Sequence, residues 1–376
     1  MEAILAGGRI GLAVLSTLGL LALVPTTGHA GCDTAIRVLL ERSREPITMQ
    51  IDGRRRIVQR VGRGVQVDRG PVRARWRSGP IGSARVAGLR VGGSLEAYLD
   101  DGVVVLVNEV PLEPYVAGAI GGEMPTDWAG DALRAQAVAS RTYVLHQRAT
   151  AASSGRGWDV ESGTTSQVYA GLDAAAPARR AVDDTRCEIL TRAGKPILAA
   201  FHSASGGRTA SAREVWGESL SYLVSVDVPD EEDSPDTYWR AGISRSTLGR
   251  ALKAAGFPIG AIASVAVEDR SESGRVRWIR FQGDRGNVRL SGRQLRSALG
   301  ESTLRSTLFE VKPNSDGFVF VGSGRGHGVG MSQWAARSLA DQGATYREIL
   351  EKFYPGTTLG RWQGSRTVAL HETSAR

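Results

Sequence analysis

The pattern of hydrophobic positions between residues 35 and 110 predicts β-strands. This region contains short runs rich in Val, Ile and Leu, which are separated by Gly, Asp and Arg, and several runs alternate apolar with polar residues. A period of two is typical of antiparallel strands that bury one face. The expected strands are AIRVLL, ITMQID, GVQVDR, ARVAGLRV, GSLEAYLD and GVVVLVNEV.

The pattern becomes helical at Pro111. The run PLEPYVAGAI predicts a short helix, because proline fits the first turn of a helix. A longer alanine-rich helix is expected over residues 129–147, and its small side chains allow close packing against a neighbour. The residues that recur on one face of it are Leu133, Ala137, Ser140 and Val144. We therefore expect a buried central helix.

The second half of the chain mixes both patterns. Strands are expected at QVYAG, CEILTRAG, PILAAFHS, YLVSVDV and VRWIRFQG, and helices at SRSTLGRALKAAG, MSQWAARSLADQG and YREILEKFY. Thr345 and Glu348 form a capping-box pattern at the start of the last helix. The last fifteen residues are polar and are expected to be disordered. These elements predict an α+β fold with β-rich lobes around the central alanine-rich helix, in which two lobes form a substrate cleft.

The first thirty residues have the architecture of an export signal. Arg9 precedes an uncharged apolar run of 15 residues, and GHA places small residues at Gly28 and Ala30. The run is short for a membrane span, which needs about 20 residues. We expect cleavage after Ala30 and an exported protein, periplasmic or extracellular, with no stable membrane span. An uncleaved anchor and a lipid anchor on Cys32 are the alternatives.

Composition adds two constraints. The only cysteines, Cys32 and Cys187, could form one disulfide in an exported protein but cannot build a zinc cluster by themselves. The formal net charge is +8, and only four of the 47 basic residues are lysine. No nucleic-acid-binding motif accompanies this charge, so we expect no nucleic acid partner. Attraction to an anionic cell envelope and arginines scattered for solubility both remain open.

Polar residues beside glycine mark four segments that are candidates for chemistry. They are GGEMP, TTSQVYAG, FHSASGGRT and GRGHGVGMSQW. Glycine lets the backbone approach a ligand closely, and polar loops between buried elements often carry function. From spacing alone, Glu123 in GGEMP could be an acid that caps the following helix or a reactive carboxylate. His202 is more typical of a structural histidine than of a metal ligand.

Two familiar sites are excluded by their missing residues. The glycines of GRGHGVG lack the Lys-Ser/Thr of a nucleotide-binding loop. The serines beside His202 lack the GxSxG turn of a serine hydrolase.

Five segments in the same order resemble the family of stage II sporulation protein D and the amidase enhancer LytB. They are VPLEPYVAGAIGGEMP, ALRAQAVASRTYVL, SQVYAG, FHSASGGRTASAREVWGESLSYLVSV and GRGHGVGMSQWAARSLADQGATYREILEKFYPGT. The resemblance runs from about residue 93 to 357. Together with the export-signal, strand and tail patterns above, it gives the domains 1–30 (signal peptide), 31–92 (N-terminal β-rich region), 93–357 (family domain, with an insert at about 228–315) and 358–376 (polar tail).

The resemblance implies a lytic transglycosylase that cleaves the bond between N-acetylmuramic acid and N-acetylglucosamine in peptidoglycan strands stripped of stem peptides. It places the catalytic acid at Glu123, the glutamate of EMP. Arg141 is expected to orient this acid or to bind substrate. The other expected substrate-binding residues are Gln167, Tyr169, His202, Ser203, Ser205, His327, Ser332 and Gln333. Relatives that hold zinc do so with a cysteine near the FHS segment, which is missing here, so we expect no metal and no cofactor.

Two other functions fit the same residues. The first is a peptidoglycan-binding activator of a cell-wall amidase, which would not cut glycan. The second is a cell-wall amidase with His202 and His327 as zinc ligands, although neither histidine has a recognised metal-ligand spacing.

Overall fold

The computed structural model describes residues 32–163, 166–228, 231–364 and 366–369. The expected export signal and its cleavage site therefore lie outside the described residues. In the described part, no helix has the length and apolar character that crossing a membrane requires.

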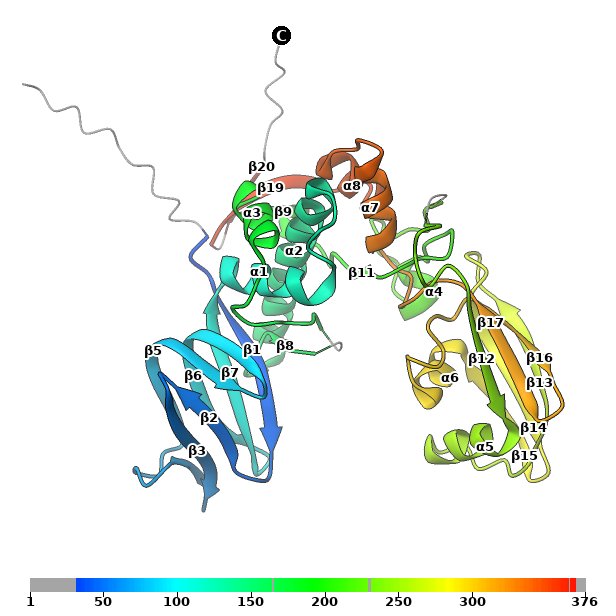
Figure 1. The fold of residues 1–376 in the computed structure, drawn as a ribbon, viewed down its shortest axis with the longest axis horizontal. Coiled ribbons are helices and arrows are strands. Elements are labelled where there is room, and N and C mark those ends of the chain that lie inside the picture. Colours follow the sequence, from blue (N-terminus) through cyan, green and yellow to red (C-terminus); the bar gives the residue numbers. More distant parts are fainter. Residues whose placement is uncertain (1–31, 164–165, 229–230, 365, 370–376) are drawn as a thin grey trace, which may run out of the picture. The chain divides into compact units, whose positions relative to one another are not determined.

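An eight-stranded sheet forms the N-terminal part of the structure (Figure 1). Its strand order is β4-β3-β2-β5-β6-β7-β1-β8, and only β8 runs parallel to its neighbour. The strands are β1 (Ala35–Ser43), β2 (Ile47–Ile51), β3 (Arg54–Val61), β4 (Gly64–Val67), β5 (Arg75–Val86), β6 (Leu89–Asp100), β7 (Val103–Pro111) and β8 (Val160–Glu161). The expectation of one strand at ARVAGLRV is wrong, because β5 ends at Val86 and a tight turn at Ala87 and Gly88 leads into β6.

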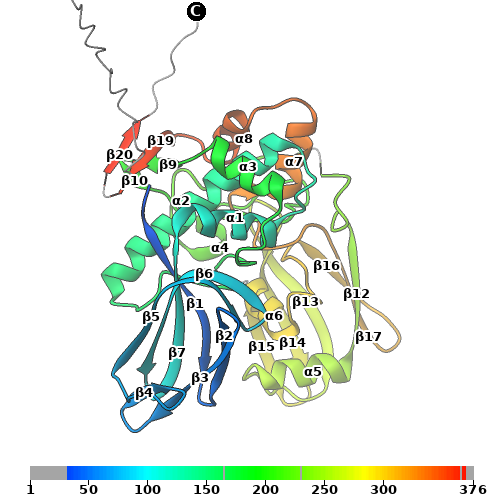
Figure 2. The same ribbon diagram turned by 60° about the vertical axis from the view of Figure 1, so that its left-hand side comes forward.

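Three helices share the core of this sheet, and the third of them packs on the other two (Figures 1 and 2). They are α1 (Leu112–Glu123), α2 (Gly130–Ser154) and α3 (Ala176–Asp184). The expected buried face of α2 is confirmed, since Leu133, Ala137, Ser140 and Val144 are all fully buried. Much of the core between sheet and helices comes from branched apolar side chains of β1, β6 and β7.

A second core lies on the other side of α2. It joins α2 to α7 (Gln333–Asp341), to α8 (Tyr346–Phe353) and to the chain around residues 197–200. The Thr345–Glu348 capping box at the start of α8 is present. The remaining elements of this part are β9 (Glu188–Arg192), β10 (Lys195–Pro196), β11 (Phe201–His202), α4 (Ala212–Trp216), β18 (Met331–Ser332), β19 (Thr358–Gln363) and β20 (Arg366–Ala369).

Several expectations for this region are wrong. QVYAG and YLVSVDV are not strands, and PILAAFHS contains only the last residue of β10 and the two-residue strand β11. The polar C-terminal segment was expected to be disordered, but β19 and β20 pair with each other, and β19 pairs with β9. Residues 370–376 lie outside the described residues.

A third core belongs to a segment whose first and last described strands, β12 and β17, lie side by side. β12 (Trp239–Ser244) pairs with β17 (Gly317–Gly322), so that Trp239 lies opposite Gly322. Between them lie α5 (Arg245–Ala254), β13 (Ile262–Arg270), β14 (Val276–Gly283), β15 (Gly286–Ser291), α6 (Gly292–Leu299) and β16 (Phe309–Pro313). These elements share their own apolar core and form two three-stranded sheets. We call residues 239–322 the insert.

The two cysteines are joined. Cys32 and Cys187 form a disulfide that links residues 155 positions apart in sequence. A sulfur atom in a disulfide cannot also carry the thioether of a lipid anchor, so the disulfide argues against a lipoprotein. Disulfides persist in oxidising compartments, which is consistent with export.

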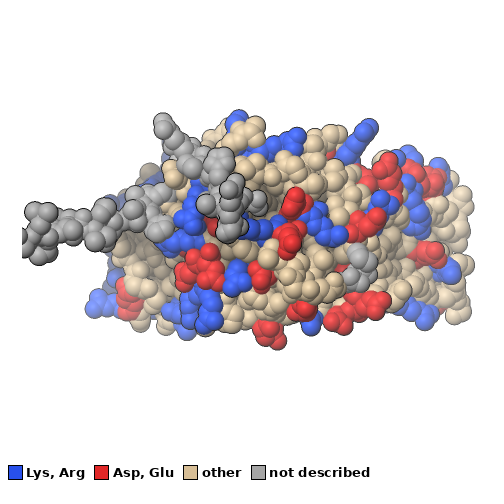
Figure 3. Space-filling model, turned by 90° about the horizontal axis from the view of Figure 1, so that it is seen from above, with Lys and Arg blue, Asp and Glu red and all other residues tan. Residues whose placement is uncertain are grey.

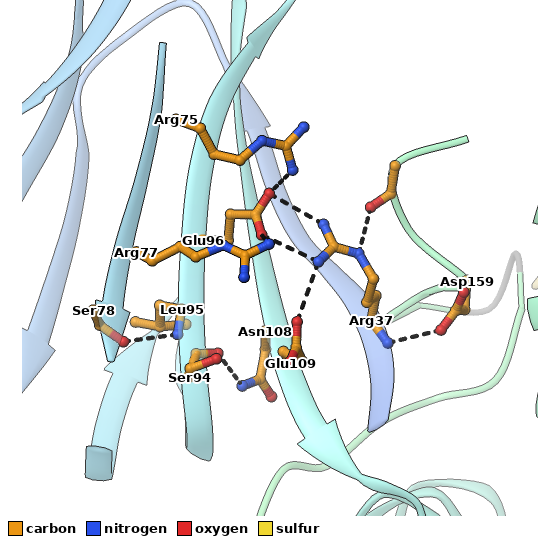
Figure 4. A network of polar contacts seen from close by, with 11 residues as sticks. Arg37, Arg75, Arg77, Ser78, Ser94, Leu95, Glu96, Asn108, Glu109 and Asp159 are labelled. Atoms are coloured by element: carbon orange, nitrogen blue, oxygen red, sulfur yellow. Dashed lines mark hydrogen bonds and ion pairs between the residues drawn. The ribbon is translucent and has the colours of Figure 1, made fainter. Parts of the chain in front are cut away.

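A buried carboxylate gathers three arginines on the sheet (Figure 4). Glu96 on β6 is only 2% exposed in its side chain and pairs with Arg37, Arg75 and Arg77. The backbone N–H of Arg37 also donates to Asp159, 2.9 Å away. This bond fixes the chain before β8 against β1, and therefore anchors the segment that continues toward Val168.

The elements confirm an α+β fold with a large β-sheet. The two lobes with a cleft between them, and the domain boundaries given above, stay predictions. On the face shown in Figure 3, acidic and basic side chains are interspersed rather than separated into large patches.

Candidate active site

Glu123 is the last residue of α1, and it does not cap the following helix. Helix α2 begins at Gly130, its N-cap is Ala129, and no side chain caps it. The C-terminal end of a helix carries partial negative charge, so a carboxylate is disfavoured there. The capping explanation for Glu123 is therefore wrong, and its position needs another reason.

Two glycines on α1 let another segment approach Glu123. A Cβ atom at Gly122 would overlap the carbonyl oxygen of Val168, and one at Gly118 would overlap that of Gly171. The N–H of Ala170 donates to the carbonyl of Gly118, 3.1 Å away. This close packing brings the N–H of Val168 to within 2.6 Å of Oε1 of Glu123.

The surroundings of Glu123 favour the protonated acid. Burial raises the pKa of its carboxyl group above the ordinary value, and hydrogen bonds from Val168 and from the Gln333 side chain oppose this effect in part. Burial raises the pKa of the neighbouring Tyr143 as well, and the charge of Glu123 adds to that shift. A carboxyl group that keeps its proton to higher pH is suited to act as a general acid.

Aromatic contacts join the segment after α1 to helix α7, and both lie beside Glu123. Trp128, which follows α1, packs against Trp334 of α7 with ring centroids 4.7 Å apart. The guanidinium group of Arg337 lies over both rings. Gln333, the residue before Trp334, also donates to Gln136 of α2 over 3.4 Å. Helix α7 is thereby held where its first residue meets Glu123.

Gln167 and Tyr169 lie beneath this site and are buried. Gln167 accepts a hydrogen bond from Tyr115 over 2.8 Å, and the ring of Tyr169 stacks on that of Tyr115 at 5.3 Å. Both side chains are no more than 1% exposed. They position the segment that carries Val168, which is a different role from the substrate contact expected for them.

Arg141 does not contact Glu123. It is fully buried and forms an ion pair with Glu113, with 2.6 Å between Nη2 and Oε2. Its Nη1 donates to the carbonyl of Glu188, and Glu113 accepts from the N–H of Cys187 beside the disulfide. The expectation that Arg141 orients the acid or binds substrate is corrected by this geometry, because its charge is already neutralised in the core.

The two histidines lie close together, with ring centroids 5.7 Å apart. His202 uses Nδ1 to contact the carbonyl of Val329, and its Nε2 has no hydrogen-bond partner among the residues that the structure describes. His327 accepts from the N–H of Val329 at Nδ1 and hydrogen-bonds the backbone of Phe201. Burial lowers the pKa of each to about 3.

This arrangement does not suit a zinc site. The Nδ1 lone pair of His327 is occupied by an N–H, and the hydrogen bond to Phe201 uses the other ring nitrogen as a donor. Within the described ranges, the one trio of His, Cys, Asp or Glu close enough to share a metal is Cys32, Glu113 and Cys187. Its two sulfurs are already joined in the disulfide.

Glu231 accepts hydrogen bonds from serines of two sequence motifs, FHSASGGRT and GRGHGVGMSQW. Its carboxylate accepts from Ser205 through N–H and Oγ, from the N–H of Gly206, and from the Oγ of Ser332. Ser205 and Ser332 are fully buried, and Ser203, which is partly exposed, offers its carbonyl to Trp334. The hydroxyl groups of Ser205 and Ser332 therefore bind Glu231, although the sequence suggested substrate.

Glu231 was not expected to matter from the sequence. It stands in the run PDEEDSPDT, where several neighbouring acids look alike. Burial separates it from its neighbour, since Glu231 is 6% exposed whereas Glu232 is exposed, and only the fold shows that it bonds the two serines.

Comparison with known proteins identifies relatives of the chain. The model of the stage II sporulation protein family matches residues 100–192, which include Glu123. A domain of unknown function matches residues 218–330.

Three similar proteins span most of the chain. An uncharacterized protein of Brachyspira hyodysenteriae is 33% identical over 72% of this chain and 73% of its own length. Stage II sporulation protein D of Bacillus amyloliquefaciens is 34% identical over 67% of this chain and 75% of its own length. The amidase enhancer of Bacillus subtilis is 29% identical over 64% of this chain, which corresponds to 40% of the longer relative. On this similarity, the chain belongs to the family of stage II sporulation protein D and the amidase enhancer LytB.

Proposed function

We propose that this protein is an envelope enzyme that cleaves peptidoglycan glycan strands as a lytic transglycosylase, with Glu123 as its acid. The observation that carries the proposal is the partly buried carboxyl group of Glu123, whose pKa is raised and which is held by an N–H and a side-chain amide. Family membership supports a role in the cell wall.

The reaction needs one group that first gives and then takes a proton. Glu123 protonates the oxygen between N-acetylmuramic acid and N-acetylglucosamine, and the bond from that oxygen to C1 of the muramic acid breaks. The C6 hydroxyl of the same sugar bonds to C1, and its proton passes to the Glu123 carboxylate. The products are a 1,6-anhydro sugar and a free 4-hydroxyl group, and Glu123 is protonated again.

A single carboxyl group suffices for this chemistry. Hydrolytic glycosidases position a second carboxylate to activate water or to attack the sugar. Here the nucleophile is part of the substrate, and an intramolecular hydroxyl has a high effective concentration. The hydrogen bonds from Val168 and Gln333 fix one orientation of the carboxyl group, which an acid that transfers protons twice requires.

The direct test is product analysis. Purified protein is incubated with peptidoglycan and with glycan strands stripped of peptides, and the products are weighed by mass spectrometry. We expect anhydro-muramic ends from the wild type and none from Glu123→Gln. Exposed Glu232, changed to Gln, is the matched control. New reducing ends would identify a hydrolase instead.

A second function is supported by one relative, which is named an amidase enhancer. In this alternative the protein binds peptidoglycan, stimulates a cell-wall amidase and cuts nothing. Release of stem peptides only when an amidase is added, equally with the wild type and Glu123→Gln, would favour this alternative.

A further inference from the structure

A cavity lies apart from Glu123, where the insert meets the family motifs. Its volume is about 700 Å³. One wall is α4 with Trp216 and the loop that holds His327, and the other comes from β14 and α6 of the insert. Residues that contact Glu123, such as Val168 and Gln333, do not line it.

The charge of this cavity is positive. Four arginines line it against two glutamates. Arg293 and Arg296 already donate to carbonyl groups, and Arg296 and Arg277 also pair with Glu301 and Asp269, respectively. Among the described residues, these pairs leave Arg275 and Arg293 as the two lining arginines without an ion pair.

Arg275 is a buried cation for which the described residues provide no ion pair. It is only 3% exposed, and its two terminal nitrogens donate to the carbonyl oxygens of Arg208 and Ser205. Its Nε has no hydrogen-bond partner within the described ranges. Glu214 and Glu231 lie near enough to stabilise its charge electrostatically, but neither forms an ion pair with it. A carboxylate or phosphate bound in direct contact would compensate the buried guanidinium group further.

The other side chains in the cavity are typical of a sugar site. Trp216 and Trp278 contribute two indole rings, and Ser271, Ser291 and Ser297 contribute hydroxyl groups. Cavities of this size, with aromatic walls and a few polar groups, are typical of small-molecule sites.

We propose that this cavity is a second binding site, distinct from Glu123, for a saccharide that carries a carboxylate, with Arg275 facing the anion. The proposal rests on the proposed function only in the source of the sugar, since muramic acid in the glycan strand carries such a carboxylate on its lactyl group. A strand held here and at Glu123 would be gripped at two points.

The test uses the full mature chain and three probes: N-acetylmuramic acid, neutral N-acetylglucosamine and inorganic phosphate. Binding is measured by saturation-transfer NMR and by quenching of tryptophan fluorescence. We expect N-acetylmuramic acid to bind at least about tenfold more tightly than N-acetylglucosamine, because charge-assisted hydrogen bonds discriminate by about this factor. Equal binding of the two sugars would overturn the proposal. Phosphate that binds as tightly as N-acetylmuramic acid would make the cavity a simple anion site and would also overturn it.

Three variants locate the site. Arg275→Gln should weaken binding at least about tenfold. Ser297→Trp fills the cavity from the exposed face of α6 and should abolish binding even if Arg275→Gln fails to fold. Arg250→Gln is the matched control, because Arg250 is an exposed arginine on α5 that does not line the cavity.

Failure of this proposal differs from failure of the proposed function. Glu123→Gln should bind N-acetylmuramic acid in the cavity as the wild type does while forming no anhydro product. Loss of cavity binding in Glu123→Gln, with retention in Ser297→Trp, would place the sugar at Glu123 and overturn the second site.

Discussion

The N–H of Val168 donates to Oε1 of Glu123 over 2.6 Å, although the two residues are 45 positions apart in sequence. The contact exists because Gly118 and Gly122 remove side-chain bulk from the face of α1 that meets residues 168–171. A carboxyl group at the end of one helix is thus held by a segment that is neither helix nor strand. The position of Glu123 depends on how closely this segment can approach α1.

Gly122→Ala tests that dependence. The added methyl group would overlap the backbone of Val168, so the segment must move, and overpacking of this kind costs about 1–3 kcal/mol of stability. We expect a lower thermal midpoint and loss of most glycan cleavage.

Gly121→Ala is the control on the same helix. Its Cβ would lie 3.8 Å from the nearest atom, in Ala174, and alanine favours the helix over glycine by about 1 kcal/mol. Stability should stay the same or rise and activity should persist. If Gly122→Ala behaves in the same way, close packing does not position Glu123.

Gln333 lowers the pKa of Glu123, so replacing Gln333 should shift the pH dependence of glycan cleavage. The hydrogen bond from Gln333 favours the ionised carboxylate, so Gln333→Leu should raise the pKa of Glu123 further. The protonated form would then persist to higher pH, and the alkaline fall of kcat/KM should move upward. Gln282→Leu on the exposed side of β14 is the control, and it should leave the profile in place. An unchanged profile in Gln333→Leu would mean that another group sets it.

The raised pKa of Glu123 also predicts a dependence of stability on pH. Burial disfavours the charged form in the folded state, so the protonated group contributes stability at low pH that is lost as pH rises through its folded pKa. Glu123→Gln stays neutral and should gain in thermal midpoint relative to the wild type above that pH. The two proteins should converge in acid. A constant difference across pH would contradict a raised pKa.

Much of the fold follows from periodicity, but contacts between distant segments do not. The buried face of α2 could be predicted because one helix determines it. The turn between β5 and β6 could not, since Ala87 adopts a positive φ of 49°, which alanine rarely does. QVYAG has the composition of a strand, yet its N–H groups donate to α1, to Ser162 and to Glu123.

In the candidate site, too, some residues could be predicted from the sequence and others could not. A motif identified Glu123, because the acid lies within a recognisable run of residues. Arg141 and the serines looked like ligands for substrate because their polar groups had no visible partner in sequence. Their partners, Glu113 and Glu231, are recognised only when the chain is folded.

Glu231 should be far more sensitive to substitution than its exposed neighbour Glu232. Glu231→Gln keeps the size but loses the charge that accepts bonds from Ser205, Gly206 and Ser332, and a hydrogen bond to a charged group contributes about 1.5–3 kcal/mol. We expect the free energy of unfolding to fall by about that amount in denaturant titrations. Glu232→Gln, the exposed neighbour, should have little effect. Equal effects of the two changes would contradict the role of Glu231 in joining the two serine motifs.

The disulfide should contribute a large part of the stability. It closes a loop of 155 residues, and native disulfides in exported proteins typically contribute about 2–5 kcal/mol. The double variant Cys32→Ser with Cys187→Ser should melt at a lower temperature than the wild type, and dithiothreitol should lower the midpoint of the wild type only. A wild type that is insensitive to reductant under unfolding conditions would contradict the pairing.

Acid should destabilise the protein through its buried histidines. Burial holds the pKa of His202 at about 3, whereas the unfolded chain titrates near 6.5, so the neutral ring contributes stability that is complete above pH 6.5 and is lost as pH falls toward 3. At pH 5 the loss from this one residue should be about 2 kcal/mol.

The variant His202→Gln tests this pH dependence, because it keeps a donor for the carbonyl of Val329 but cannot titrate. Its thermal midpoint, measured from pH 7.5 to pH 4, should fall less steeply than that of the wild type, even if it starts lower. His146→Gln, on the partly exposed face of α2, is the control and should keep the steep dependence. A wild type and a His202→Gln variant with parallel curves would show that His202 is protonated in the folded protein without cost, and its Nε2 would then need an anionic partner.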